Sequence, residues 1–134
     1  MAVKFGVAMG CHVTVISRGP SKKEEAISRL GAHAFLDSTD PVAWAAAREN
    51  FDQIVDTIAA DHDIKAYMGL LAINGKLILV GAPPVPFNLG AFDFIPRRKS
   101  LVGSLIGGIK ETQEMLDFCG KNQVFCDVEV IRPD

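Results

Sequence analysis

The stretch Val13–Lys23, VTVISRGPSKK, decides the fold class of this chain. It opens with the apolar and β-branched run Val13–Ile16, which is typical of a buried strand. The run then breaks at the turn-forming pair Gly19-Pro20, which has hydroxyl groups and cations around it. In open α/β sheets, ligands bind beyond the carboxyl ends of the strands. The stretch therefore predicts one strand of a parallel α/β sheet, with a ligand site where that strand ends.

The polar residues at this strand end predict a phosphate site. Ser17, Arg18 and Lys22 stand where an Asp or Glu would hold a ribose 2′-hydroxyl, and residues 17–23 include no acidic side chain. A guanidinium binds phosphate through two hydrogen bonds, and an ammonium adds a point charge. The functional interpretation is that these three residues hold the adenosine 2′-phosphate of NADP(H). The alternative interpretation is a solvated basic turn before a helix.

Strands and helices alternate along the rest of the chain. We expect strands at 13–16, 34–36, 53–58, 76–80 and 100–105, helices at 1–9, 21–30, 41–50, 63–72 and 110–121, and a final strand-like segment at 125–131. Ser21 and Glu24 have the spacing of a capping box, which would begin the second of these helices. Such alternation predicts a single α/β domain with a Rossmann-like, doubly wound parallel sheet.

Composition limits the class of protein. The chain has 134 residues, 49% hydrophobic and 22% charged, which suits one globular domain. A net charge of −2 argues against a general affinity for nucleic acid or for an anionic membrane. No apolar run approaches the roughly 18 residues of a membrane span. The three cysteines, Cys11, Cys119 and Cys126, are odd in number and widely spaced, so we expect free, buried thiols in a reducing, cytoplasmic setting.

Four blocks of sequence carry a resemblance to a known family. They are VTVIS with the Ser/Arg/Lys turn and EEA after it, IVDTIAA at 54–60, GKLILVGAP at 75–83, and VGSLIGGIKETQEMLDF at 102–118. In this order they resemble the nucleotide-binding domain of the zinc-dependent medium-chain alcohol dehydrogenases, in the cinnamyl and sinapyl alcohol dehydrogenase branch. The resemblance covers nearly the whole chain. It implies an NADP(H)-dependent oxidoreductase that transfers hydride between NADPH and an aldehyde.

The resemblance also implies a second set of cofactor contacts, made mostly by the main chain. It places Thr57 and Ala59 beside the nicotinamide ribose. It places two short backbone segments beside the carboxamide: Val80-Gly81-Ala82 and Ser104-Leu105-Ile106. From the residues alone, the glycine is equally well explained by a turn after a strand, and Thr57 by its preference for strands.

Several parts of the family pattern have no counterpart in this sequence. In the family, a strand and a GxGGxGH turn precede the helix expected at 1–9, so the resemblance implies a truncated domain that begins at Met1. The missing strand would separate strands 13–16 and 53–58. We therefore expect these two either to pair directly or to leave open ladder edges that favour oligomers.

The resemblance also gives this chain no zinc ligand and no catalytic residue. The family's zinc ligands fall in a domain that would precede Met1, so no residue here is assigned to a metal or to catalysis. Asp61-His62-Asp63 could suggest a metal or acid–base cluster, but we interpret it as the solvated start of a helix. As this chain alone, the protein is expected to be inactive.

Two other functions remain open, together with one interface. The chain could be a non-catalytic truncated module that binds a nucleotide or a protein partner. It could also belong to the zinc-free quinone reductase branch, against which the block GSLIGGIKETQEM argues weakly. The resemblance further implies a homodimer through Leu101–Ile109. The sequence does not indicate the alcohol or aldehyde substrate.

Overall fold

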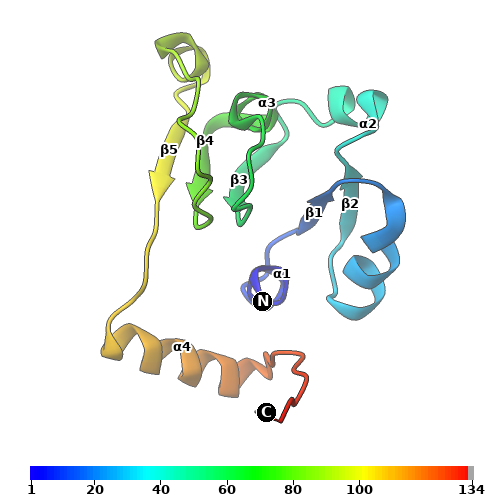
Figure 1. The fold of residues 1–134 in the computed structure, drawn as a ribbon, viewed down its shortest axis with the longest axis vertical. Helices are drawn as coiled ribbons and strands as arrows, with labels where there is room; N and C mark the ends of the chain where they lie inside the picture. The colour runs from blue at the N-terminus through cyan, green and yellow to red at the C-terminus, as the bar shows by residue number, and fades with distance from the viewer. Residues whose placement is uncertain (133–134) are drawn as a thin grey trace. The chain divides into compact units, whose positions relative to one another are not determined.

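The computed structural model describes residues 1–132, which divide into two compact units. The first unit joins the start of the chain, Met1–Asp37, to its end from Gly107 onward, and the second is Ser38–Ile106. Each unit has its own parallel sheet, so the chain has a Rossmann-like α/β fold built on two small sheets (Figure 1).

The first unit is built around a two-stranded parallel sheet. Strand β1 (Thr14–Ser17) pairs with β2 (Ala34–Asp37) from Thr14 opposite Ala34 to Ser17 opposite Asp37. Helix α1 (Ala2–Ala8) precedes β1, and the long helix α4 (Ile109–Asn122) follows much later in the chain. The rings of Phe5 in α1 and Phe118 in α4 have centroids 6.0 Å apart, which joins the two ends of the chain in one unit.

The expected helix at 21–30 is replaced by two short pieces. Pro20–Lys22 form a single 3-10 turn, and Glu25–Arg29 form a π-helical segment. The capping-box prediction is wrong, because Ser21 lies inside the 3-10 turn and neither piece has a side-chain cap. Ala26 on this segment is nevertheless buried, so the segment still covers the sheet as a helix would.

The second unit is built around three parallel strands in the order β3–β4–β5. These strands are Phe51–Asp56, Leu71–Leu79 and Ser100–Gly103. The short helices α2 (Pro41–Ala46) and α3 (Ile64–Leu70) both begin at aspartate caps: the Asp40 carboxylate accepts from Val42 N and Ala43 N, and the Asp63 carboxylate accepts from Ala66 N. The core of this unit is Ile54, Ile64, Met68, Leu70, Leu71 and Leu77. Parallel pairing brings the carboxyl ends of all three strands to one edge.

Two other predictions from the sequence are wrong within the described residues. The segment 125–131 forms no strand there, and Lys4 holds it by donating to Phe125 O and Asp127 Oδ2 at 2.8 and 2.9 Å. The thiols are free as expected but not buried, since Cys11 and Cys126 are exposed and Cys119 is intermediate.

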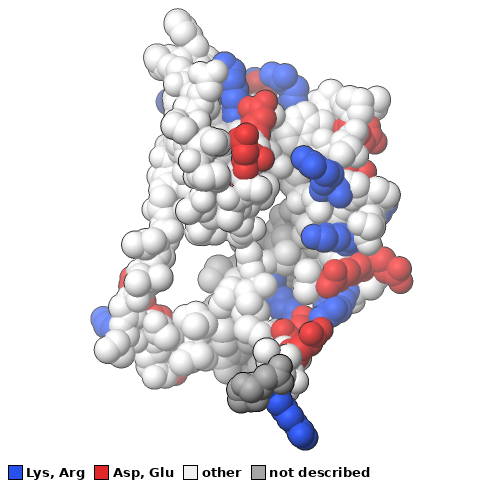
Figure 2. All heavy atoms as spheres, viewed as in Figure 1, with Lys and Arg blue, Asp and Glu red and all other residues white. Residues whose placement is uncertain are grey.

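The strands expected at 13–16 and 53–58 belong to different sheets. Direct pairing, one of the two expected outcomes, does not occur in the part of the chain that the structure describes. On the face shown in Figure 2, basic and acidic side chains are interspersed. No helix in residues 1–132 combines the length and the apolar character needed to cross a bilayer.

Candidate functional site

The predicted cofactor residues fall into two groups, one in each unit. Ser17, Arg18 and Lys22 lie at the end of β1 in the first unit. The second group lies at the carboxyl edge of β3–β4–β5 in the second unit and comprises Thr57, Ala59, Val80, Gly81, Ala82, Ser104 and Ile106.

In the first unit, a carboxylate from the neighbouring strand supports the turn after β1. Gly19 adopts a left-handed backbone with φ of 73°, which glycine tolerates at little cost. Its N–H donates to Asp37 Oδ1 at 2.8 Å, and Asp37 ends β2 directly opposite Ser17. Arg18 and Lys22 are exposed on either side of this support. The turn therefore displays two cations on a backbone that is anchored to the sheet.

Asp37 is a residue that the sequence interpretation did not include. No acid lies within residues 17–23, as the sequence shows, but this one comes from the next strand. The sequence did contain a signal for Asp37, which directly follows the apolar run Ala34–Leu36. If that strand pairs in parallel with the strand that ends at Ser17, both strand ends lie at the same edge of the sheet.

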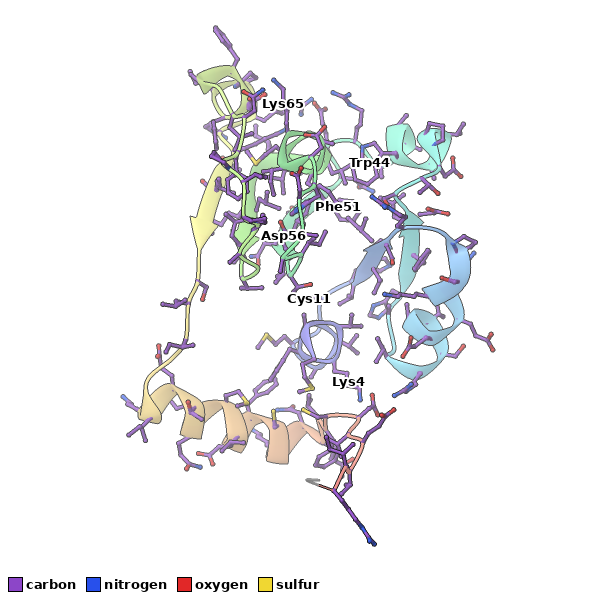
Figure 3. The ribbon with its side chains drawn as sticks, viewed as in Figure 1. Lys4, Cys11, Trp44, Phe51, Asp56 and Lys65 are labelled. Atoms are coloured by element: carbon purple, nitrogen blue, oxygen red, sulfur yellow. The ribbon has the colours of Figure 1, made fainter. Side chains whose placement is uncertain are left out.

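In the second unit, Asp56 joins the ends of two strands. Asp56 is the last residue of β3 and only 4% exposed, and Figure 3 labels it where that strand ends. Its backbone carbonyl accepts from Val80 N and Gly81 N at 2.9 and 3.0 Å, and its Oδ1 accepts from Ile58 N at 2.9 Å. One buried residue thus fixes both the turn after β3 and the turn after β4.

Gly81, in the turn after β4, packs directly against Ile58 in the turn after β3. A Cβ built on Gly81 would lie 2.3 Å from the carbonyl oxygen of Ile58 and 2.6 Å from its carbonyl carbon. Any side chain would overlap the backbone there, so only glycine fits. Thr57 and Ala59 flank Ile58, so they lie close to the segment Val80–Ala82, and this part of the predicted group is brought together.

The third segment of the group follows β5 at the same edge. Ser104 N donates to Leu79 O at 3.0 Å, so the chain leaving β5 stays beside the end of β4. Beyond Ser104 the chain runs outward, with Leu105 92% exposed and Ile106 89% exposed. The structure therefore gathers Thr57, Gly81 and Ser104 at one edge and leaves the side chain of Ile106 in solvent.

His62 lies beside this edge and is not the solvated residue that the sequence suggested. Its side chain is 10% exposed, Nδ1 lies 2.8 Å from Ala60 O, and Nε2 lies 2.8 Å from Asp56 Oδ2. The ring also meets Tyr67 of α3 edge to face, with centroids 5.5 Å apart. Burial acts to lower the pKa of His62. The hydrogen bonds to Ala60 and Asp56 and the charges of Asp56 and Asp61 outweigh it, so the pKa is raised above its usual 6.5.

The described residues contain no metal centre. Within residues 1–132, no three side chains of His, Cys, Asp or Glu come together as ligands. A zinc site with the usual three or four protein ligands therefore does not fit the side chains described here. At the edge of β3–β4–β5, the missing side chain of Gly81 makes room for the backbone of Ile58, which lets the turns after β3 and β4 pack together.

Comparison with known proteins gives the family. Residues 1–121 match the family model described as zinc-binding dehydrogenase. A probable mannitol dehydrogenase of Medicago sativa is 52% identical over 132 residues, covering 98% of this chain and 37% of that protein. This chain thus spans little more than a third of that curated relative.

Solved structures agree in fold. A cinnamyl alcohol dehydrogenase from Sorghum bicolor superposes with a TM-score of 0.94 at 44% identity, covering 98% of this chain and 37% of that one. CAD from Helicobacter pylori, in a crystal structure complexed with NADP(H), gives a TM-score of 0.83 at 45% identity, with the same coverage of both chains. The family match spans well over half of the sequence, so this chain belongs to the zinc-binding dehydrogenase family, in agreement with the resemblance of its four motifs.

Proposed function

We propose that this chain is the cofactor-binding domain of an alcohol dehydrogenase and that its cofactor is NADP(H). The observation that carries the proposal is the turn after β1, where Arg18 and Lys22 are exposed beside a backbone anchored by Asp37. The Helicobacter pylori relative, whose crystal structure is complexed with NADP(H), supports the choice of cofactor.

In this proposal the two groups of residues bind different parts of the cofactor. Ser17, Arg18 and Lys22 hold the adenosine 2′-phosphate. Thr57 and Ala59 border the nicotinamide ribose, and the segments 80–82 and 104–106 border the carboxamide. The bound cofactor supplies the hydride, and these residues supply binding and orientation.

The whole enzyme would reduce an aldehyde or oxidise an alcohol, with zinc bound outside the residues described here. Two relatives named for different substrates, mannitol and cinnamyl alcohol, leave the substrate class open. The three free thiols support a reducing, cytoplasmic location.

The 134-residue chain by itself should show no turnover. We expect purified chain to reduce no cinnamaldehyde-type aldehyde with NADPH, with or without added zinc, because residues 1–132 bring no set of metal ligands together. The measurement is NADPH oxidation followed at its absorbance band. A heat-treated sample is the control, and turnover above it that a chelator abolishes would contradict the prediction.

We also propose that the chain forms a homodimer. Its interface would be the segment Leu101–Ile109, which includes the end of β5 and the residues after it. In the described residues β5 pairs with β4 alone, so one ladder edge of β5 is open, and Leu105, Ile106 and Ile109 are about 90% exposed. An open strand edge beside exposed apolar residues is a template for pairing with a second copy.

Charges placed on this apolar segment should dissociate the dimer. Replacing Leu105 and Ile106 by aspartate should shift the mass measured by analytical ultracentrifugation from two chains to one, because like charges would face each other across a symmetric interface. Val42→Asp is the control, since Val42 is also exposed, at 77%, but lies on α2 outside the segment. If the wild-type chain is monomeric at all concentrations, the dimer proposal fails.

A further inference from the structure

The two hydrogen bonds made by the ring of His62 require one more proton than a neutral histidine carries. Ala60 O can only accept, so Nδ1 of His62 must donate to it. The 2.8 Å contact between Nε2 and Asp56 Oδ2 then needs a further proton, because two lone pairs would otherwise face each other. The pair therefore holds one proton more than a neutral imidazole beside a carboxylate.

This extra proton lies in the contact that restrains Asp56. The second carboxylate oxygen of Asp56 accepts from Ile58 N, and its carbonyl accepts from Val80 N and Gly81 N. The side chain of Asp56 is only 3% exposed, so its rotation away from His62 would leave a buried carboxylate short of a partner, which is costly. A change at His62 should therefore be felt at Ile58, Val80 and Gly81.

The remaining surroundings of the ring are consistent with a bound proton. Asp61 on the same turn adds a negative charge, and Tyr67 of α3 contributes an aromatic edge contact. Asp63 and Lys65, at the start of α3, line a hollow of about 170 Å³ together with His62 and residues of the loop 83–88. The two charges that act on the ring, those of Asp56 and Asp61, are both negative.

We propose that His62, with both ring nitrogens protonated, is the positioning residue that holds the turn 56–60 against Gly81. It acts through Asp56, which fixes the backbone on which Thr57 and Ala59 stand. The restraint on this turn follows from the structure of the chain alone. Its position beside the nicotinamide half of the cofactor rests on the proposed function.

The direction of the pH dependence follows from the raised pKa of His62. A group whose pKa is higher in the folded than in the unfolded chain stabilises the fold fully below the unfolded value. That contribution is lost as pH rises through the folded value. The turn should therefore be held tightly below about pH 6.5 and released at higher pH.

The first experiment needs no cofactor. Histidine ¹⁵N NMR on the 134-residue chain should show protons on both nitrogens of His62 at pH 6. Hydrogen exchange should show protection of the amides of Ile58, Val80 and Gly81 that falls about tenfold or more as His62 titrates, the size expected for loss of a charge-assisted hydrogen bond. Protection of the Leu77 amide, at a fully buried position in β4, should stay constant.

Two substitutions separate positioning from simple packing. In His62→Gln the amide nitrogen can still donate to Asp56 but does not titrate, so protection should be kept and its pH dependence lost. In His62→Asn the shorter side chain cannot span to Asp56, so protection should be low at every pH. His12→Asn, an exposed histidine in the first unit, is the matched control and should behave as wild type.

Two results would overturn the restraint: an unprotonated Nε2 at pH 6, or equal protection in His62→Asn and wild type. A cofactor arm then tests the last step in the full-length enzyme, where the Kd for NADPH should rise with pH in wild type but not in His62→Gln. If the amides respond and the Kd does not, the restraint stands and the assignment of the turn to the cofactor is wrong. If neither the amide protection nor the Kd for NADPH changes with pH, the restraint by His62 is wrong as well.

Discussion

Replacing Arg18 and Lys22 together by alanine should raise the Kd for NADPH in the full-length enzyme about a hundredfold. The Kd for NADH should stay nearly unchanged, because NADH lacks the 2′-phosphate that these cations would meet. A hydrogen bond to a charged group is worth about 1.5–3 kcal/mol, and each 1.4 kcal/mol is a factor of about ten in affinity. Removing two such hydrogen bonds from an exposed turn, where water screens part of the charge, gives an effect of this order.

Lys23→Ala provides a matched control for this double substitution. Lys23 is an exposed cation next to the same turn, so its loss lowers the charge without removing an assigned phosphate contact. We expect a much smaller change in the Kd for NADPH. The measurement is fluorescence titration with each cofactor at two salt concentrations, and the NADPH preference should weaken at the higher one. Equal losses for NADPH and NADH would mean that the turn is structural.

Asp37 is an acidic residue near the proposed phosphate site, and the sequence analysis did not take it into account. Its carboxylate lies beside the turn and could be expected to repel a phosphate. Its Oδ1, however, is occupied by the N–H of Gly19 at 2.8 Å, and the contact is partly buried. We interpret Asp37 as the support of the turn, which keeps Arg18 and Lys22 displayed at the sheet edge.

The sequence predicted the strands well because their signal is local. Ile54 in β3 and Leu77 in β4 belong to apolar runs and are both buried, and each observed strand lies within a few residues of its expected place. The largest difference is in β4, which begins at Leu71 and continues through Asn74-Gly75. That pair predicts a turn, but here Asn74 takes a φ of 62° and the pairing with β3 shifts register between Phe51 and Gln53.

Features that depend on contacts between distant residues were not predictable in the same way. A strand at 125–131 has the right alternation of residues, but a strand also needs a partner, and the described chain offers none there. His62 follows Asp56 by six residues, and no periodic pattern indicates that their side chains meet. The pair could have been suspected only from a charged residue in a buried strand, which needs a partner wherever it lies.

Gly81→Ala should strongly destabilise the second unit. The added methyl would lie 2.3 Å from the Ile58 carbonyl oxygen, a backbone atom that cannot rotate away as a side chain could. Asp56 accepts hydrogen bonds from Ile58 in one turn and from Val80 and Gly81 in the other. Neither turn can therefore move away from the other without breaking a hydrogen bond to Asp56. Overpacking of this kind costs about 3 kcal/mol or more, a large share of the roughly 5–15 kcal/mol that stabilises a typical domain.

The measurement is urea unfolding followed by the fluorescence of Trp44, the single tryptophan, which lies in the same unit and packs on Tyr67 with ring centroids 5.2 Å apart. Gly69→Ala in α3 is the matched control, because a Cβ there meets no atom within 4 Å. Alanine is also about 0.5–1 kcal/mol more favourable than glycine inside a helix. We therefore expect Gly69→Ala to unfold at the same urea concentration as wild type or a slightly higher one, and Gly81→Ala at a much lower one. A midpoint for Gly81→Ala that matches the control would show that the turns after β3 and β4 can move apart freely. The close approach at the centre of the proposed nicotinamide site would then have no structural consequence.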